Sequence, residues 1–529
     1  MRTLVATEPD EGDAESGDTP PEPPSGRSIP SWMVTFSLVG VAVLGIALRF
    51  VTTSKLWLDE ALTVNISRLP VGDLLEALKH DGHPPLYYVL LHYWMEVFGH
   101  GDVPARALSG VIGVATLPLA WIAGRRLGGT TAARWSLVVV ALSPYCVRYS
   151  SEARMYSLVM LLVLAGYLLL TDALREPTPL RLGGLAVLSG VLLLSHYWSI
   201  WLLGSVGLLL LLRWRRSPAA ERPATRRALV AIAAGGVLFL PWLPSFLYQA
   251  DHTGTPWAGP MRPSSIPAVA LTDLGGGINL YEATLYGMVL LLGSLLALFV
   301  VRSNGPELFL DLRTTPLVRP LLAVTVLTLA VGAATAYPTG ATFQSRYAAV
   351  VVPFVLVAVG VGLALLPATA RLTLGAVLVG LSGFGIVWNL YFERTQAPQV
   401  SEQIAAHAQP GDVVVFCPDQ LGPAFSRDLP EGMQAVSYPT LDDPAVVDWV
   451  DYADRQAAAD PVRIADEVRG MAAGHDVFVV WRDGYETFGD QCQQLRQELG
   501  EGGSTVDLVI SQPKRFYETA YLSQISLGP

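Results

Sequence analysis

The feature that most constrains this chain is a series of apolar segments between residues 31 and 392. A transmembrane helix needs about 20 apolar residues, and about 17 can suffice. Only 15% of the residues are charged, whereas an average soluble domain has about 25%. We therefore predict a polytopic α-helical membrane protein with about 11 transmembrane helices. The expected spans lie near 31–51, 105–124, 132–148, 155–172, 183–196, 198–212, 229–248, 284–301, 317–336, 347–367 and 372–392.

The least certain of these segments, 183–212, could form one long helix or two short helices that turn at "SHYWS". Basic sequences flank it on both sides, "ALREPTPLR" before and "RWRRSPAAERPATRR" after. Loops rich in Lys and Arg favour the cytoplasm, so both can lie inside only if the segment is a hairpin. The same rule predicts a multi-pass plasma-membrane protein with a cytoplasmic N-terminus. The loops 52–104, 249–283 and 337–346 and the C-terminal part are then extracytoplasmic.

The two ends of the chain differ from its middle in composition. Residues 1–30 are polar, acidic and rich in proline, which predicts a disordered cytoplasmic tail and not a signal peptide. Residues 393–529 alternate strand patterns such as "GDVVVFCP" and "HDVFVVWRD" with helical patterns such as "PVRIADEVRGMAA". This alternation predicts a small extracytoplasmic α/β domain. In an oxidising compartment Cys417 and Cys492 could form a disulfide, or they could remain two buried thiols.

An unusual acid pair, Asp59 and Glu60, follows the first span in "KLWLDEALTVNISRLP". A charge beside a bilayer is costly unless it faces water or takes part in chemistry. Just downstream, "VGDLLEALKH" has its leucines on one helical face, which predicts a helix lying on the membrane surface. The first outer loop, 52–104, is therefore a candidate functional region.

Other ionisable residues fall at the same outer face, in "DGHPPLYYVLLHYW", "SPYCVRYSSEARMYSL" and "SRYAAVVVP": His83, Arg148, Glu152, Arg154 and Arg346. Several have an ordinary explanation. Arg148 could reach lipid headgroups, Arg346 could anchor the outer end of its span, Glu60 could be solvated, and His83 could cap a turn. Asp59 is harder to explain in this way because a short acid cannot snorkel. Ionisable residues gathered at one membrane face indicate a functional site.

Taken together, these motifs resemble the GT-C glycosyltransferase superfamily. They are most similar to its bacterial branch related to protein O-mannosyltransferases and lipid A aminoarabinose transferases. The resemblance rests on "LWLDEALT", "DGHPPLYYVLLHYWMEVFG", "SPYCVRYSSEARMYSLVMLL" and "SRYAAVVVP", in that order, and covers roughly residues 31–392. The C-terminal domain, residues 393–529, resembles no family that we can name.

The resemblance implies a membrane glycosyltransferase that takes a sugar from a polyprenyl-monophosphate donor. It implies that an acid of the first outer loop is the catalytic base, which assigns that role to Asp59 with Glu60 beside it. Glu152 matches the second acidic position of the family. Mannose or arabinose is the expected sugar. The acceptor could be a cell-envelope glycan, a lipoglycan or a protein, and the C-terminal domain could either recognise it or only cover the site.

Elementary chemistry agrees with this expectation. A carboxylate can remove the proton of an acceptor hydroxyl while the sugar carbon is attacked. The leaving lipid phosphate needs positive charge, which the planar fork of arginine supplies well. One base acting opposite the phosphate predicts inversion at the sugar carbon. The predicted substrate-binding residues are His83, Lys55, Arg154, Tyr156 and Arg346.

No cofactor is expected, because no glycine-rich nucleotide loop is evident. A divalent metal held by His83 with Asp59 or Glu152 stays an open alternative. The chain lacks a basic patch with interleaved aromatics, so nucleic acid is not an expected partner. The competing functions are a transporter or flippase of a lipid-linked envelope precursor, and a scaffold. Charges gathered at one face, without an internal repeat, favour the enzyme.

Overall fold

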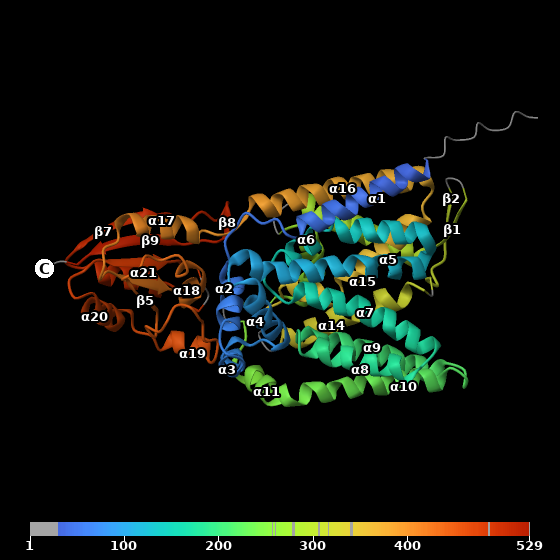
Figure 1. The fold of residues 1–529 in the computed structure, drawn as a ribbon, viewed down its shortest axis with the longest axis horizontal. Coiled ribbons are helices and arrows are strands. Elements are labelled where there is room, and N and C mark those ends of the chain that lie inside the picture. The colour runs from blue at the N-terminus through green and yellow to red at the C-terminus, as the bar shows by residue number, and fades with distance from the viewer. Residues whose placement is uncertain are drawn as a thin grey trace, which may run out of the picture.

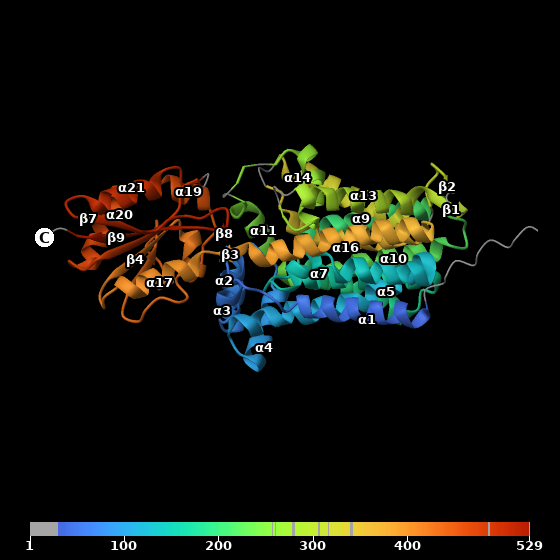
Figure 2. The same cartoon turned by 90° about the horizontal axis from the view of Figure 1, so that it is seen from above.

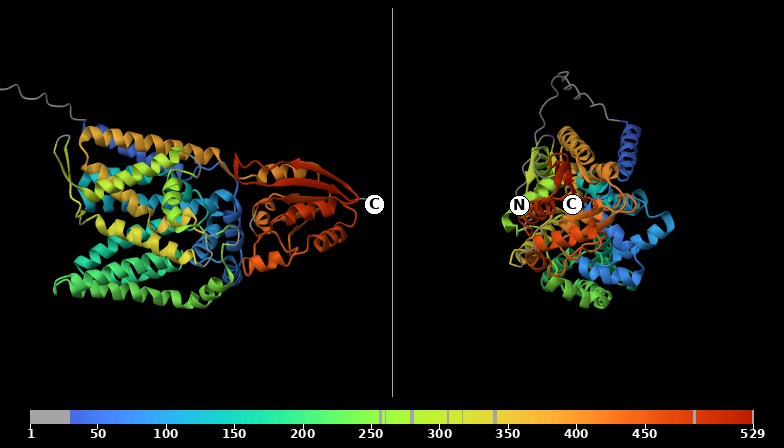
Figure 3. Two further views of the ribbon diagram at one scale, coloured as in Figure 1. Left: turned by 180° about the vertical axis from the view of Figure 1, so that it is seen from behind. Right: turned by 90° about the vertical axis from the view of Figure 1, so that its left-hand side faces the viewer.

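The computed structural model describes residues 30–255, 258–259, 261–277, 281–304, 307–315, 317–338, 342–484 and 487–527. The predicted disordered tail, residues 1–30, lies outside these ranges apart from Pro30. Long helices form a bundle at one end of the molecule and an α/β domain forms the other end, with short helices between them (Figure 1). Figure 3 shows the same end-to-end arrangement from behind.

Long apolar helices build the bundle. Within the described ranges, six helical stretches are long and apolar enough to cross a membrane, and three shorter apolar helices accompany them. This confirms a multi-pass helical protein, while the count of 11 spans stays a prediction. The helices are α1 (Ser31–Leu48), α5 (Asp102–Ala141), α7 (Tyr156–Arg175), α8 (Pro179–Leu193), α9 (Trp198–Arg216), α10 (Arg222–Gly235), α11 (Leu243–His252), α12 (Ile266–Leu274), α13 (Tyr281–Phe299), α14 (Arg319–Ala336), α15 (Val352–Leu365) and α16 (Ala368–Tyr391).

The hairpin predicted for residues 183–212 is confirmed, because α8 and α9 are separate helices that turn between Leu194 and Tyr197. The basic end of α9 and the start of α10 lie at the end of the bundle far from the α/β domain (Figure 1). A strand pair, β1 (Val300–Asn304) with β2 (Glu307–Leu310), lies at the same far end, in a segment that we had expected to be only a loop.

Two predicted spans end differently from the expectation. The span 132–148 stops at Ala141, because Pro144 starts a new helix, α6 (Pro144–Ser150), which the Ser143 side chain caps. The span 347–367 is divided into a 3₁₀ turn, η3 (Ser345–Val350), and α15. The predicted span 105–124 and residues 132–141 of the next span both fall within α5, where non-helical backbone at Gly128 and Gly129 separates them, with a φ of 75° at Gly129.

Three short helices lie across the bundle end that faces the α/β domain: α2 (Leu58–Ser67), α3 (Val71–Asp81) and α4 (Leu86–Phe98) (Figures 1 and 2). The predicted amphipathic helix is α3, in which Leu74 and Leu78 are fully buried, while its place on a membrane surface stays a prediction. It ends at Gly82, whose φ of 80° suits a glycine. These helices form most of the first outer loop and form the floor below the α/β domain.

The C-terminal α/β domain has a five-stranded sheet in the order β5-β4-β6-β9-β7. Strands β5, β4 and β6 are parallel, and β9 pairs antiparallel with β6 and β7. A disulfide joins Cys417 on β4 to Cys492 on α21. The elements are α17 (Ala397–His407), β4 (Val413–Cys417), α18 (Gly422–Phe425), β5 (Gln434–Ser437), α19 (Tyr452–Ala457), α20 (Pro461–Ala472), β6 (Val477–Trp481), α21 (Gln491–Gly500), β7 (Ser504–Val509) and β9 (Tyr521–Ser526).

The connection between the two parts is short and specific. The helix α16 ends at Tyr391, and β3 (Glu393–Thr395) then pairs in parallel with β8 (Phe516–Glu518). The Glu518 carboxylate accepts a hydrogen bond from the Leu58 N–H at the start of α2, at 3.2 Å. The C-terminal part of the chain, which follows the bundle, therefore contacts the bundle again next to Asp59 and Glu60. We propose the domain boundary at residues 392/393 on this basis.

Candidate active site

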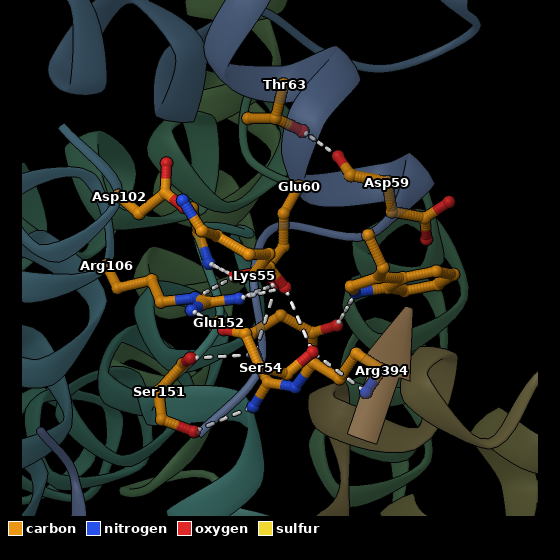
Figure 4. A network of polar contacts seen from close by, with 12 residues as sticks. Ser54, Lys55, Asp59, Glu60, Thr63, Asp102, Arg106, Ser151, Glu152 and Arg394 are labelled. Atoms are coloured by element: carbon orange, nitrogen blue, oxygen red, sulfur yellow. Dashed lines mark hydrogen bonds and ion pairs between the residues drawn. The ribbon is translucent and has the colours of Figure 1, made fainter. Parts of the chain in front are cut away.

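The adjacent acids of α2 have opposite surroundings. Successive residues of an α-helix point about 100° apart, and Figure 4 shows the Asp59 and Glu60 side chains pointing to different sides of the helix. Glu60 enters a crowded group of arginines, whereas Asp59 points away from it. The two carboxylates therefore belong to different environments.

Glu60 is fully buried and every side of it is occupied. Arg106 donates two hydrogen bonds to it, at 2.7 and 2.6 Å, and Arg394 lies 3.2 Å from Oε2. The Ala153 N–H also donates to Oε1, at 2.9 Å. Burial by itself would raise the pKa of Glu60, but the charges and hydrogen bonds of the arginines, with the Ala153 bond, lower it to about 2. Glu60 is thus an ionised structural anchor.

The arginines around Glu60 extend this anchor to neighbouring segments (Figure 4). Arg106, on α5, also donates to the Ser54 and Lys55 carbonyls, at 2.6 and 3.0 Å. Arg394, on β3, donates to the carbonyl and the hydroxyl of Ser151, each at 2.9 Å. This network joins α2, α5, the segment after α6 and the first strand after the bundle. Glu60 was predicted to be catalytic together with Asp59. Because its carboxylate is fully engaged in this network, we give it no catalytic role in the proposed mechanism.

Among the described side chains, Asp59 has one ion-pair partner, and its Oδ2 atom is buried and makes no hydrogen bond. Its Oδ2 lies 2.8 Å from Arg346 Nη1, and both side chains are partly accessible, at 16% and 14%. Within the described part of the chain, Arg346 Nε has no hydrogen-bond partner. The Arg346 guanidinium also lies 5.7 Å from the Trp57 ring centroid. Asp59 therefore faces open space with one arginine beside it.

That space consists of two cavities with Asp59 and Arg346 in the wall of each. The inner cavity, about 280 Å³, lies toward the bundle and includes Asp81, His83, Arg154, His196, Trp198 and Phe246. The outer cavity, about 320 Å³, lies toward the α/β domain and includes Trp57, Gln420, Trp449, Arg482, Tyr517 and Glu518. Trp449 contributes to both. The Asp59 carboxylate thus stands where two ligands could meet.

Arg154 and His83 line the inner cavity as parts of a buried hydrogen-bond chain. Arg154 Nη1 donates to the hydroxyls of Thr63 and Tyr88, at 2.7 and 3.2 Å, and Nη2 lies 2.8 Å from His83 Nε2. Because a guanidinium can only donate, His83 Nε2 accepts and its Nδ1 carries the proton that is donated to Asp81 at 2.9 Å. Burial would raise the pKa of Asp81, yet the hydrogen bonds from His83 and Tyr88 and the charge of Arg154 lower it.

The other predicted site residues lie behind the cavities or outside them. Glu152 is buried and accepts a hydrogen bond from the Trp57 indole N–H at 2.7 Å, so it positions a wall residue. Tyr156 is buried against His196 and Arg154. Lys55 is half exposed and pairs with Asp428 at 3.3 Å. Glu152, Tyr156 and Lys55 are absent from the lining of both cavities.

The possible metal site gains no support from the side chains that the structure describes. They include no group of three or more His, Cys, Asp or Glu residues placed to hold a metal ion. Both ring nitrogens of His83 are already engaged, by Asp81 and Arg154. A divalent metal therefore remains an untested alternative and does not enter the mechanism.

Sequence reasoning missed several residues of the site. Arg106 falls in the first turn of the predicted span 105–124 and was not considered as a site residue. Asp81 stands two positions before His83, and its carboxylate could have been expected to orient the ring. Arg394 and Glu518 gave no local signal, because they reach the site only through the return of the chain after the bundle.

Comparisons with known proteins agree with this architecture. The family described as dolichyl-phosphate-mannose-protein mannosyltransferase matches residues 82–244. The crystal structure of ArnT from Cupriavidus metallidurans bound to undecaprenyl phosphate matches with a TM-score of 0.59 and 13% identity, over 93% of this chain and 98% of that chain. Its apo state gives a TM-score of 0.60 and 13% identity, over 94% and 99%. No curated protein matches the sequence significantly.

At 13% identity the structural likeness establishes the fold. The family match adds the region that holds His83, Glu152 and Arg154. Together they show a GT-C-like fold and a likeness of residues 82–244 to this mannosyltransferase family, in line with the resemblance of the motifs.

Proposed function

We propose that this protein transfers a sugar from a polyprenyl-monophosphate donor to an acceptor hydroxyl outside the cytoplasm, with Asp59 as the general base. Mannose and arabinose are the sugars to test first. The observation that carries the proposal is the position of the Asp59 carboxylate in the common wall of two cavities, paired to Arg346 at 2.8 Å. One cavity can hold the donor while the acceptor reaches the same carboxylate from the other.

The inner cavity suits the donor, because a lipid-linked substrate must arrive from the bilayer. Its wall includes Trp198 on α9 and Phe246 on α11, which are apolar side chains of bundle helices. It also holds Arg154 and Arg346, whose planar forks match phosphate oxygens. The match to a protein bound to undecaprenyl phosphate supports a lipid phosphate as the ligand to test.

Arg346 can pair with Asp59 and can also bind the phosphate of the donor. Arg346 neutralises Asp59, and its Nε has no hydrogen-bond partner among the described residues. A phosphate in the inner cavity would compete for this guanidinium. Asp59 would then be released to accept the hydroxyl proton as the acceptor oxygen attacks the sugar carbon and the lipid phosphate leaves. Attack from the side opposite the phosphate inverts the sugar carbon.

The position of the ionisable residues along the bundle favours an enzyme over a transporter. Asp59, Asp81, Glu152 and Arg346 all lie at the bundle end beside the α/β domain, and not near the middle of the long helices. Transporter sites are typically found near the bilayer midplane. The disulfide between Cys417 and Cys492 supports an oxidising compartment for the α/β domain, and hence for this end of the molecule.

The test uses purified full-length protein with radiolabelled polyprenyl-phospho-mannose and, separately, polyprenyl-phospho-arabinose. Cell-envelope extract supplies the acceptor. We expect one donor to lose its sugar with wild-type protein, and we expect Asp59→Asn to slow this loss about 10²–10⁴-fold. Folded protein that turns over neither donor would contradict the proposal for these two sugars. Undiminished turnover in the variant would remove Asp59 from the mechanism.

A further inference from the structure

The outer cavity lies at the junction of the two domains, and both domains contribute to its wall. The bundle side supplies Trp57 and Asp59 from the start of α2, together with Arg346. The α/β domain supplies Gln420, Trp449, Arg482, Tyr517 and Glu518. On this side, Asp59 therefore borders a space that the two domains build together.

The lining of this cavity combines aromatic rings with hydrogen-bonding groups. Trp57 and Tyr517 meet edge to face, with ring centroids 5.2 Å apart, and Tyr517 remains 48% exposed. Trp449 is fixed against the floor by a backbone hydrogen bond from its N–H to the His80 carbonyl, at 3.0 Å. Among the described lining residues, only Leu58 is aliphatic.

Glu518 adds an observation that is independent of the cavity shape. Its side chain is 5% exposed, and Oε1 accepts from the Leu58 N–H while the Thr395 hydroxyl lies beside the carboxyl. Oε2 is buried and has no hydrogen-bond partner within the described part of the chain. Burial raises the pKa of Glu518 to about 8, so the group is a neutral acid near pH 7 that can both donate and accept.

We propose that the outer cavity is the acceptor subsite and that it takes the terminal sugar of an envelope glycan, with Glu518 and Tyr517 as specificity-determining residues. This inference rests on the proposed function and names its acceptor class. The flat face of a sugar ring can pack on Tyr517 or Trp449, while its hydroxyls bond to Glu518, Gln420 and Arg482. The hydroxyl that attacks would point to Asp59.

The other acceptor classes fit this space less well. A lipid chain would need a continuous aliphatic wall, which the described lining lacks. A volume of about 320 Å³ is at the small end of ligand pockets, which span roughly 300–1,000 Å³. Such a space suits the end of a chain better than an extended peptide segment. A protein acceptor therefore becomes an outcome of the test.

The experiment follows the radiolabel from the donor that wild-type protein consumes. The envelope extract is divided into a deproteinised glycan fraction and a protein fraction, and each is offered separately. Kinetics with the glycan fraction are then measured for Tyr517→Ala and Glu518→Gln. The matched controls are Tyr93→Ala on α4 and Glu467→Gln on α20, which are exposed and line neither cavity.

We expect the label to enter the glycan fraction. Each cavity variant should raise the KM for glycan about tenfold or more, equivalent to the loss of about one good contact. The KM for the donor should stay within about twofold of wild type, and the controls should behave as wild type. Thermal unfolding of each variant separates a local effect from misfolding, and Glu518→Gln keeps the shape of the side chain.

Two results would overturn the inference and leave the proposed function intact. One is label that enters only the protein fraction. The other is an unchanged KM for glycan in both folded cavity variants. Absence of donor turnover with either fraction, and with whole extract, would instead contradict the proposed function, and the acceptor assignment would fall with it.

Discussion

Asp59 and Glu60 are neighbours in sequence, yet they belong to two regions with opposite physical character. Glu60 is fully buried, ion-paired to Arg106 and Arg394, and closed on all sides. Asp59 has one arginine partner and borders two cavities. A carboxylate with every lone-pair direction occupied can hold a structure together, but it cannot accept a proton from a substrate. The comparison therefore supports our proposal that Glu60 stabilises the protein and that Asp59 carries the chemistry.

The largest expected effect on stability comes from Glu60→Gln. The substitution keeps the shape of the side chain but leaves the charges of Arg106 and Arg394 buried without a counter-ion. Breaking a buried pair by removing one partner typically costs about 3–5 kcal/mol. Thermal unfolding in detergent should show a clear loss, and the connection between the α/β domain and the bundle should become sensitive to protease. Wild-type stability in this variant would mean that the network is not an anchor.

The arginine partners of the two acids offer a matched pair of variants. Arg106→Gln should destabilise the protein much as Glu60→Gln does, because it removes both short hydrogen bonds to Glu60. Arg346→Gln should leave unfolding nearly unchanged, since Asp59 is partly accessible to water. It should instead raise the KM for the donor about tenfold or more, by the loss of a charge-assisted phosphate contact. Equal unfolding temperatures for Arg106→Gln and Arg346→Gln would contradict the different roles proposed for the two arginines.

A smaller effect is expected when the pH is lowered, because the stabilisation by Glu60 depends on its charge. The pKa of Glu60 is about 2 in the folded protein, below its ordinary value of 4.5. A lowered pKa stabilises the folded state above pH 4.5 and loses this contribution as the pH falls toward about 2. The difference in unfolding temperature between wild type and Glu60→Gln should therefore shrink over that interval. A difference that is constant with pH would show that Glu60 contributes by packing and not by charge.

Much of the fold could be predicted from local patterns. Long apolar runs gave the bundle helices, the basic flanks of 183–212 gave the α8–α9 hairpin, and alternating strand and helix patterns gave the α/β domain. The ends of two spans were wrong because Pro144 and the 3₁₀ turn at Ser345–Val350 interrupt helices that remain apolar in sequence. Hydropathy measures burial and does not detect where backbone hydrogen bonding changes.

The site was predictable only in part, for a different reason. Motifs brought attention to Asp59, His83, Arg154 and Arg346, and all four line the inner cavity. Glu60 carries the same charge in the same motif, but its role depends on Arg394, which is 334 residues away in the sequence. Such distant contacts are set by tertiary packing, and no local pattern records them. The same holds for Glu518 in the outer cavity.

The most direct test of the account measures donor turnover and thermal unfolding on Asp59→Asn and Glu60→Gln side by side. The account predicts that Asp59→Asn unfolds at the wild-type temperature and transfers sugar about 10²–10⁴-fold more slowly. It predicts that Glu60→Gln unfolds at a lower temperature and, when kept folded in the cold, retains measurable transfer. Wild-type transfer by a folded Asp59→Asn protein would contradict the central claim that Asp59 is the base.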